Sequence, residues 1–187
     1  ISVKEFKFSK PENNETILSR QVMYLSDYLG EDNIIVVVGY KKELIMESFP
    51  NLLYVYNNYF DTTNTSKSLL KALKKNENED ILWLNGDVVF DKKLLDNIIK
   101  CPQSCMAVNT QSVGKEEIKY NVDKHGFLKY VSKSVAPALG EAVGINKIIK
   151  SDLSIYKNNL IQCKDQDYFE KAIEVSIKDG LKIIPLD

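Results

Sequence analysis

The chain has 187 residues, of which 44% are apolar and 27% are charged, a composition that is typical of a folded globular protein and excludes a disordered chain. Its 25 basic and 26 acidic side chains give a formal net charge of −1, so no basic excess points to nucleic acid as a partner. No apolar run approaches the roughly 20 residues that cross a bilayer, so we expect a soluble protein with no membrane association.

The first half of the chain alternates helical and strand patterns. Residues 15–29 carry apolar side chains at helical spacing and are followed by Gly30, which predicts an amphipathic helix that ends at a glycine. Residues 33–40 (NIIVVVGY) form a nearly continuous β-branched run, which is typical of a parallel strand buried on both faces. The alternation continues with a helix at 41–48, a strand at 52–56, a helix at 65–75, a strand at 81–84 and a helix at 92–100. Short connections between such elements favour right-handed crossovers and helices on both faces of one sheet.

The second half changes in character. Residues 105–131 alternate with a period of two, and Lys124-His125-Gly126 supplies a turn between strands at 118–122 and 127–131, which predicts an antiparallel insertion. Two helices at about 146–158 and 165–179 then lead to a final strand at 181–186. The expected fold class is therefore α/β, a three-layer α/β/α arrangement with a mostly parallel, Rossmann-like sheet and a small antiparallel insertion. Residues 1–187 are expected to form a single domain.

The cysteines do not suggest a metal site or a disulfide framework. Cys101, Cys105 and Cys163 are odd in number and lack metal-ligand spacing, and the single histidine, His125, falls in a turn that favours a plain surface position. Free cysteine usually packs as a small apolar side chain. These thiols therefore indicate a reducing, cytoplasmic setting.

Polar residues follow the three buried strands of the first half, where ligands bind in open α/β sheets. The third strand runs into Asn85-Gly86-Asp87, which places a carboxylate on a rigid scaffold at the mouth of the sheet. Such a hard ligand suits Mg²⁺, which takes one or two carboxylates together with phosphate and water. Alternatively, Asp87 caps the next helix or begins a turn, although Asp91 is the better candidate for the cap.

Two further segments allow both a functional and a structural interpretation. Residues 57–68 (NNYFDTTNTSKS) carry many hydroxyl and amide groups before a helix, where a nucleotide could bind, but Asn64, Thr65 or Ser66 could equally cap that helix. Residues 140–144 (GEAVG) place a carboxylate between small residues, which permits the close approach of a ligand or a simple bend into the next helix.

Taken in order, six segments resemble the nucleotidyltransferase superfamily that includes sugar-phosphate nucleotidyltransferases and bacterial phosphocholine cytidylyltransferases. They are ETILSRQVMYL, NIIVVVGYKKELI, YNNYFDTTNTSKSLLKAL, ILWLNGDVVFD, GEAVGINKI and QDYFEKAIEVSIKDGLKIIPLD. The resemblance covers most of the chain and implies a GT-A-like sheet. It implies attack of a substrate phosphate on the α-phosphorus of a nucleoside triphosphate, with release of pyrophosphate. The expected nucleotide is CTP, and the expected acceptor is a sugar phosphate or an alcohol phosphate such as phosphocholine. Production of a surface polysaccharide or a lipid head group is the implied setting.

The resemblance also implies roles for individual residues. It makes Asp87 a ligand of the catalytic Mg²⁺ and Lys4 the catalytic lysine that meets phosphate. It assigns nucleotide contacts to Gly39, Thr62, Thr63, Asn64, Ser66 and Gly86. Contacts with the accepting substrate fall to Glu141 and Asn109.

The sequence departs from the family pattern at both ends. A Gly-rich, Arg-containing loop should come before the lysine, yet no glycine precedes Gly30, and a second metal-binding aspartate should follow the strand that ends at Asp187. We expect these parts to have been lost from both ends. Two alternatives stay open. One is a glycosyltransferase that uses a nucleotide sugar, which usually carries Asp-x-Asp where this chain has Asp87-Val88-Val89-Phe90-Asp91, and the other is a relative that binds nucleotide without catalysis.

Overall fold

The computed structural model describes residues 15–74, 79–111 and 113–187. Their helices are α1 (Ile17–Leu29), α2 (Lys42–Ser48), α3 (Thr65–Leu73), α4 (Lys92–Lys100), α5 (Lys150–Gln162) and α6 (Phe169–Lys178), with a short 3-10 turn η1 (Glu31–Asn33). Their strands are β1 (Ile35–Val38), β2 (Leu53–Tyr56), β3 (Ile81–Leu84), β4 (Cys105–Asn109), β5 (Lys119–Val122), β6 (Leu128–Ser132), β7 (Gly140–Ile148) and β8 (Ile184–Leu186). Strands and helices alternate through the first half as predicted.

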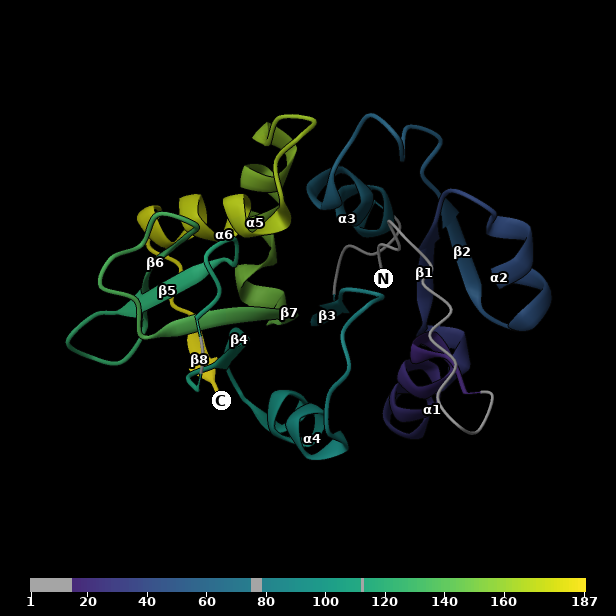
Figure 1. Ribbon diagram of the computed structural model, residues 1–187, viewed down its shortest axis with the longest axis horizontal. Coiled ribbons are helices and arrows are strands. Elements are labelled where there is room, and N and C mark those ends of the chain that lie inside the picture. Colours follow the sequence, from purple (N-terminus) through teal and green to yellow (C-terminus); the bar gives the residue numbers. More distant parts are fainter. Residues whose placement is uncertain (1–14, 75–78, 112) are drawn as a thin grey trace.

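Two sets of helices enclose the strands, as the doubly wound interpretation requires (Figure 1). Helices α3, α5 and α6 share one apolar cluster with side chains of β3, β4, β5 and β6. Helices α1, α2 and α4 share a second cluster with side chains of β1, β3, β4 and β7. In the first cluster Trp83 stacks on Tyr156, with ring centroids 5.2 Å apart and planes 19° apart. The predicted three-layer α/β architecture is confirmed.

The strands form two hydrogen-bonded groups. β1 and β2 pair in parallel, and the other six strands form a second sheet in which β8 pairs in parallel with β4. β3 and β4 both pair antiparallel with β7, so β3, β4 and β8 run in one direction and end at one edge. Among the described residues β1 and β3 do not pair, and a cavity of about 800 Å³ lies between them, lined by Ile35, Val37, Leu82 and Leu84 among others. The described pairings are therefore parallel between β1 and β2 and between β4 and β8, and antiparallel in the ladders of β7 and between β5 and β6.

Local sequence signals explain several element boundaries. Thr16 and Ser19 form a reciprocal capping box at the start of α1, and the helix ends at Gly30, whose φ of 74° favours glycine. The predicted antiparallel insertion is confirmed as the β5–β6 hairpin. In its turn, the Asp123 carboxylate accepts hydrogen bonds from the backbone N–H groups of His125 and Phe127.

The helix predicted at about 146–158 begins later than expected, and this prediction was wrong at its start. β7 runs through residues 146–148 and α5 begins only at Lys150. Of the two interpretations of residues 140–144, the bend does not hold, because β7 runs through this segment too. β7 lies between β3 and β4, so it is largely buried and lacks the alternation that marks a half-exposed strand. Gly144 adds a local irregularity with a φ of 79°. A side chain at this position would also overlap Asn85, since a Cβ added to Gly144 would lie only 2.5 Å from the Asn85 amide nitrogen.

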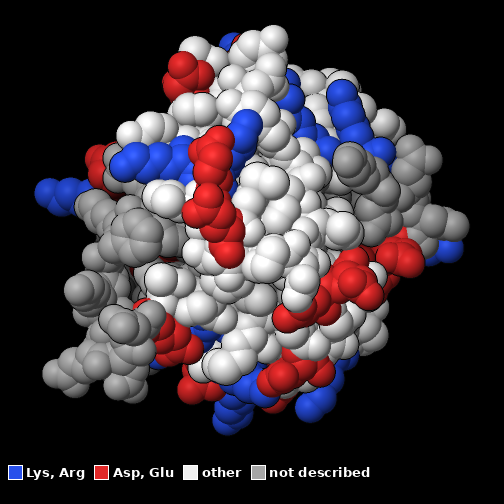
Figure 2. All heavy atoms as spheres, turned by 90° about the vertical axis from the view of Figure 1, so that its right-hand side faces the viewer, with Lys and Arg blue, Asp and Glu red and all other residues white. Residues whose placement is uncertain are grey.

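Charge is mixed on the surface. Figure 2 shows Lys and Arg side chains lying close to Asp and Glu side chains on the face viewed, with no sign covering that face. Within the described ranges, no helix combines the length and the apolar character that crossing a membrane requires.

Candidate functional site

The candidate site lies at the edge where β3, β4 and β8 end. Asp87 follows β3, Asn109 ends β4 and Asp187 follows β8, so three polar side chains project from the carboxyl ends of co-directional strands. Val88, Asn109 and Asp187 line one cavity of about 420 Å³, which also includes Lys93 at the start of α4. Open α/β sheets place ligands beyond such strand ends.

Asp87 occupies the turn directly after β3 and is exposed. Its carboxylate forms no hydrogen bond or ion pair with any described residue. The helix cap proposed as its alternative role belongs to Asp91, whose carboxylate accepts a hydrogen bond of 2.7 Å from the Lys93 backbone N–H. The structure therefore assigns the cap to Asp91 and leaves the Asp87 carboxylate accessible.

The turn that carries Asp87 is held from two sides. The Asn85 backbone N–H donates to the Gly144 carbonyl of β7 at 2.9 Å. On the other side, the Gln21 side-chain amide of α1 donates to the carbonyls of Asn85 at 3.0 Å and Val88 at 2.8 Å. No local sequence signal points to Gln21, since its partners lie 64 and 67 residues away and it occupies an ordinary position on the buried side of an amphipathic helix.

The described residues contain no group of three or more His, Cys, Asp or Glu side chains that could hold a metal ion. One accessible carboxylate does suit Mg²⁺, because this ion is usually bound through one or two carboxylates, with waters and substrate phosphates completing its shell. Asp87 fits that requirement as a single ligand. Lys4, the predicted phosphate-contacting lysine, lies outside the described residues.

Asn109 and Glu141, the two residues predicted to contact the acceptor, face each other across β4 and β7. The Asn109 amide nitrogen lies 3.5 Å from Glu141 Oε1, and Glu141 Oε2 accepts a hydrogen bond of 2.8 Å from the Gly114 backbone N–H. Both side chains are only partly buried, and Asn109 lines the cavity of about 420 Å³. The structure thus brings this predicted pair together.

The predicted nucleotide loop has a dense internal hydrogen-bond network. Asn57 is buried and its amide donates to the hydroxyls of Thr63 at 3.0 Å and Ser68 at 3.1 Å. Asn64 caps α3 by accepting a hydrogen bond of 2.8 Å from the Thr65 backbone N–H. Ser66 is fully buried. The capping interpretation therefore holds for Asn64. The hydroxyls of Thr62 and Thr63 lie nearer the surface, and both donate to the Tyr59 carbonyl, at 3.4 and 2.6 Å.

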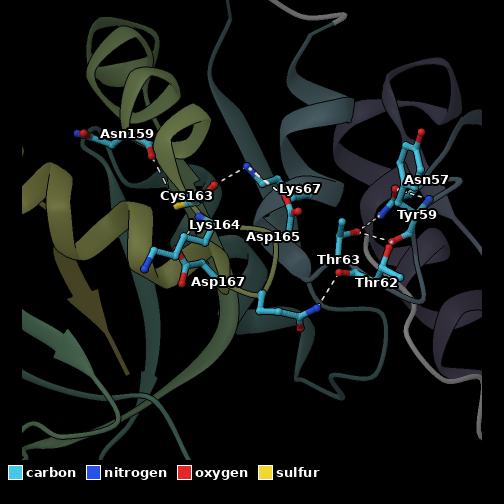
Figure 3. Close-up of polar contacts among 11 residues, drawn as sticks. Asn57, Tyr59, Thr62, Thr63, Lys67, Asn159, Cys163, Lys164, Asp165 and Asp167 are labelled. Atoms are coloured by element: carbon cyan, nitrogen blue, oxygen red, sulfur yellow. Dashed lines mark hydrogen bonds and ion pairs between the residues drawn. The ribbon is translucent and has the colours of Figure 1, made fainter.

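The same loop is tied to the connection between α5 and α6 (Figure 3). The Gln166 amide donates to the Thr62 carbonyl at 2.6 Å, and the Asn64 backbone N–H donates to the Asp165 carbonyl at 2.6 Å. Lys67 donates to the Cys163 carbonyl. These bonds join segments about a hundred residues apart in the sequence and fix the position of the loop.

The two glycines predicted to contact nucleotide differ in their surroundings. Gly39 is buried at the end of β1, and a Cβ added there would lie 2.6 Å from Phe60 Cβ. Its lack of a side chain is therefore needed for packing against Phe60. Gly86 lies half-buried in the turn beside Asp87, next to the proposed metal ligand.

The three cysteines are free and buried. Burial raises the pKa of the Cys105 thiol to about 12, so the thiol stays protonated at neutral pH. This agrees with the expectation of small apolar side chains. His125 lies in the exposed hairpin turn, as predicted.

The chain is similar in sequence to one curated protein. The chain is 30% identical over 190 residues to the bifunctional protein GlmU of Francisella philomiragia subsp. philomiragia. That match covers 94% of this chain and 42% of the relative, so the chain spans less than half the length of this curated relative.

Two solved structures share the fold at low sequence identity. The inositol-1-phosphate CTP transferase from T. maritima has a TM-score of 0.75 at 13% identity, over 95% of this chain and 75% of that one. The CTP:phosphocholine cytidylyltransferase from Streptococcus pneumoniae has a TM-score of 0.67 at 14% identity, over 95% of this chain and 78% of that one. These likenesses confirm the Rossmann-like fold class. Residues 2–174 match the family described as "Domain of unknown function (DUF6564)", and the chain therefore belongs to that family.

Proposed function

We propose that this chain forms the α/β body of a Mg²⁺-dependent nucleotidyltransferase. It transfers a nucleotidyl group, cytidylyl from CTP, to a sugar phosphate or an alcohol phosphate such as phosphocholine, and releases pyrophosphate. The observation that carries the proposal is the accessible Asp87 carboxylate at the end of β3, within a fold that two named CTP-using transferases share over 95% of this chain.

In this proposal Asp87 would hold Mg²⁺ at the mouth of the sheet, and the bound ion would supply neutralisation of the negative charge on the reacting phosphates. A single protein carboxylate is enough for this role, because Mg²⁺ usually keeps phosphate and water as its other ligands. Such a transfer depends mainly on alignment and charge neutralisation, so it needs no nucleophilic side chain. Lys4 keeps its assigned role as the phosphate-contacting lysine.

The nucleotide lies near the carboxyl ends of β1 and β3, with Thr62, Thr63 and Gly86 as its direct contacts. Asn64 and Ser66 instead support the shape of the loop, because their side chains are buried and do not reach the nucleotide. Gly39 acts through the packing of Phe60. The acceptor lies in the cavity bordered by Asn109, with Glu141 beside it. The free thiols favour a reducing, cytoplasmic setting.

Pyrophosphate release tests the proposal. The protein is incubated with Mg²⁺, each of CTP, UTP, ATP and GTP, and a panel of sugar phosphates and alcohol phosphates. We expect release with CTP and one class of acceptor, and loss of that release in Asp87→Ala. Consumption of a nucleotide sugar with no pyrophosphate release would instead support a glycosyltransferase, and CTP binding without turnover in the full-length protein would support a non-catalytic relative.

A further inference from the structure

One side of α1 contacts the segment that carries Asp87. The contact residues on the helix are Gln21, Tyr24 and Asp27, which are spaced three residues apart and therefore lie along one side of it. Their partners lie in residues 85–92, between the end of β3 and the start of α4. This side of α1 thus contacts the segment that carries Asp87 from Asn85 to Lys92.

Gln21 makes the innermost of these contacts. It is 1% exposed, and its single amide nitrogen donates to both the Asn85 carbonyl and the Val88 carbonyl. The Val88 backbone N–H closes the same turn by donating to the Asn85 carbonyl at 3.4 Å. The two carbonyls that Gln21 joins therefore flank Gly86 and Asp87, one on each side.

The outer contacts fix the segment further along. The Tyr24 and Phe90 rings meet edge to face, with centroids 5.9 Å apart. Asp27 pairs with Lys92 at 2.5 Å. Together with Gln21, these contacts hold the Asp87 segment against α1 at the Asn85–Val88 turn and beyond it.

The chemistry of Gln21 argues for a specific role rather than simple packing. Its side-chain oxygen is buried and has no hydrogen-bond partner among the described residues, which is an unfavourable state for a polar atom. An apolar side chain of similar size would fill the space without leaving such an atom. What only the amide provides at this position is a donor to both carbonyls of the turn.

We propose that Gln21 is a positioning residue that fixes the Asn85–Val88 turn and thereby the direction of the Asp87 carboxylate. The inference rests on the proposed function, in which Asp87 binds Mg²⁺. Gln21 itself touches neither metal nor substrate and acts only through the two carbonyls.

The test uses Gln21→Met, which keeps the length of the side chain and removes its donors, together with Gln21→Ala. Met23→Ala is the matched control, because Met23 lies on the same helix and is 49% exposed. Backbone hydrogen exchange is measured without metal at Asn85 and Val88, whose N–H groups donate to the carbonyls of Gly144 and Asn85. Mn²⁺ affinity is measured in the presence of CTP. The apparent Mg²⁺ constant and kcat are then determined separately.

We expect both Gln21 variants to stay folded by circular dichroism and to exchange the amides of Asn85 and Val88 about tenfold faster. Their Mn²⁺ affinity should fall by a similar factor, and the Mg²⁺ constant should rise more than kcat falls. Met23→Ala should match the wild type in every measurement. A general stabilising residue would lower the melting temperature without changing metal affinity.

Wild-type exchange at Asn85 and Val88 in a folded Gln21→Met protein overturns the proposal. So does global unfolding of both variants, because the side chain would then support the whole fold and not one turn. If Asp87→Ala leaves Mn²⁺ affinity unchanged, it is the metal assignment in the proposed function that fails, and the exchange measurement still decides the role of Gln21.

Discussion

Asn109 at the end of β4 lies directly opposite Glu141 of β7, with its amide nitrogen 3.5 Å from Glu141 Oε1. The other carboxylate oxygen of Glu141 accepts the Gly114 N–H at 2.8 Å. One carboxylate thus connects a strand end, its neighbouring strand and the loop that follows β4.

Glu141→Ala should weaken acceptor binding in the proposed reaction. The variant loses the carboxylate and its hydrogen bond with the Gly114 N–H. We therefore expect the KM for the phosphorylated acceptor substrate to rise about tenfold, with the KM for CTP nearly unchanged. Steady-state kinetics with each substrate varied in turn measures both values. The control is Glu116→Ala, whose carboxylate is 89% exposed and pairs with Lys133. Equal increases in both KM values would remove Glu141 from the acceptor site.

Asp87 and Asp91 provide a matched pair for separating function from stability. Asp87→Ala should abolish turnover with little effect on unfolding, because its carboxylate forms no hydrogen bond or ion pair with any described residue. Asp91→Ala should retain turnover and lower the free energy of unfolding by about 1 kcal/mol, because it removes the cap of α4. Urea denaturation and pyrophosphate release measure the two effects. Loss of turnover in Asp91→Ala together with lower stability in Asp87→Ala would mean that the two roles are assigned the wrong way round.

Glu170 predicts a pH dependence of stability. Its side chain is buried in the first turn of α6, and burial raises the pKa of the carboxyl from its ordinary value of 4.5 to about 7. The folded state therefore holds the proton more tightly than the unfolded state. The associated stability is present below pH 4.5 and is lost as the pH rises to about 7, with each pKa unit worth about 1.4 kcal/mol.

Glu170→Gln should remove this contribution. Its free energy of unfolding, measured in urea from about pH 4.5 to about pH 8, is expected to change less with pH than that of the wild type. The difference between the two proteins is the informative quantity, since the other titrating groups are common to both. Parallel curves would mean that Glu170 does not lose its proton in this range.

Gly39→Ala should destabilise the chain by about 1–3 kcal/mol, since the added methyl group overlaps Phe60, with 2.6 Å between the Cβ atoms. The double variant Gly39→Ala/Phe60→Gly should be less affected than the sum of the two single variants, because glycine at position 60 removes the Cβ that the added methyl group overlaps. Thermal unfolding of all four proteins completes the cycle. If the two single effects on stability simply add, a contact other than that with Phe60 requires glycine at position 39.

Much of the fold can be predicted because its signals are local. Residues 33–40 are β-branched along most of their length, and Gly30 ends the helix before them, so the sequence places β1 and α1 within about two residues of their ends. Asp91 is recognisable as a cap because it directly precedes the next helical pattern, and the structure confirms it.

The rest depends on partners far away in the sequence. The sequence predicts the start of a helix at about residue 146, where β7 still runs, because the neighbours that cover this strand, β3 and β4, are separated from it by tens of residues. The same is true of the candidate site. Asp87 can be predicted from the end of its own strand, whereas nothing near Gln21 reveals its role, because both of its partners lie more than sixty residues away.

The arrangement around β7 has a consequence for how the protein unfolds. β7 forms hydrogen bonds with β3, β4 and β5, and among the strand pairings of the described residues only those of β7 join β3 and the β5–β6 hairpin to the β4–β8 pair. When β7 detaches, these parts lose their shared ladder at once, so the second sheet is expected to open as one cooperative unit. The strand that carries Asp87 then leaves together with the strand that carries Asn109, and the candidate site is either complete or lost.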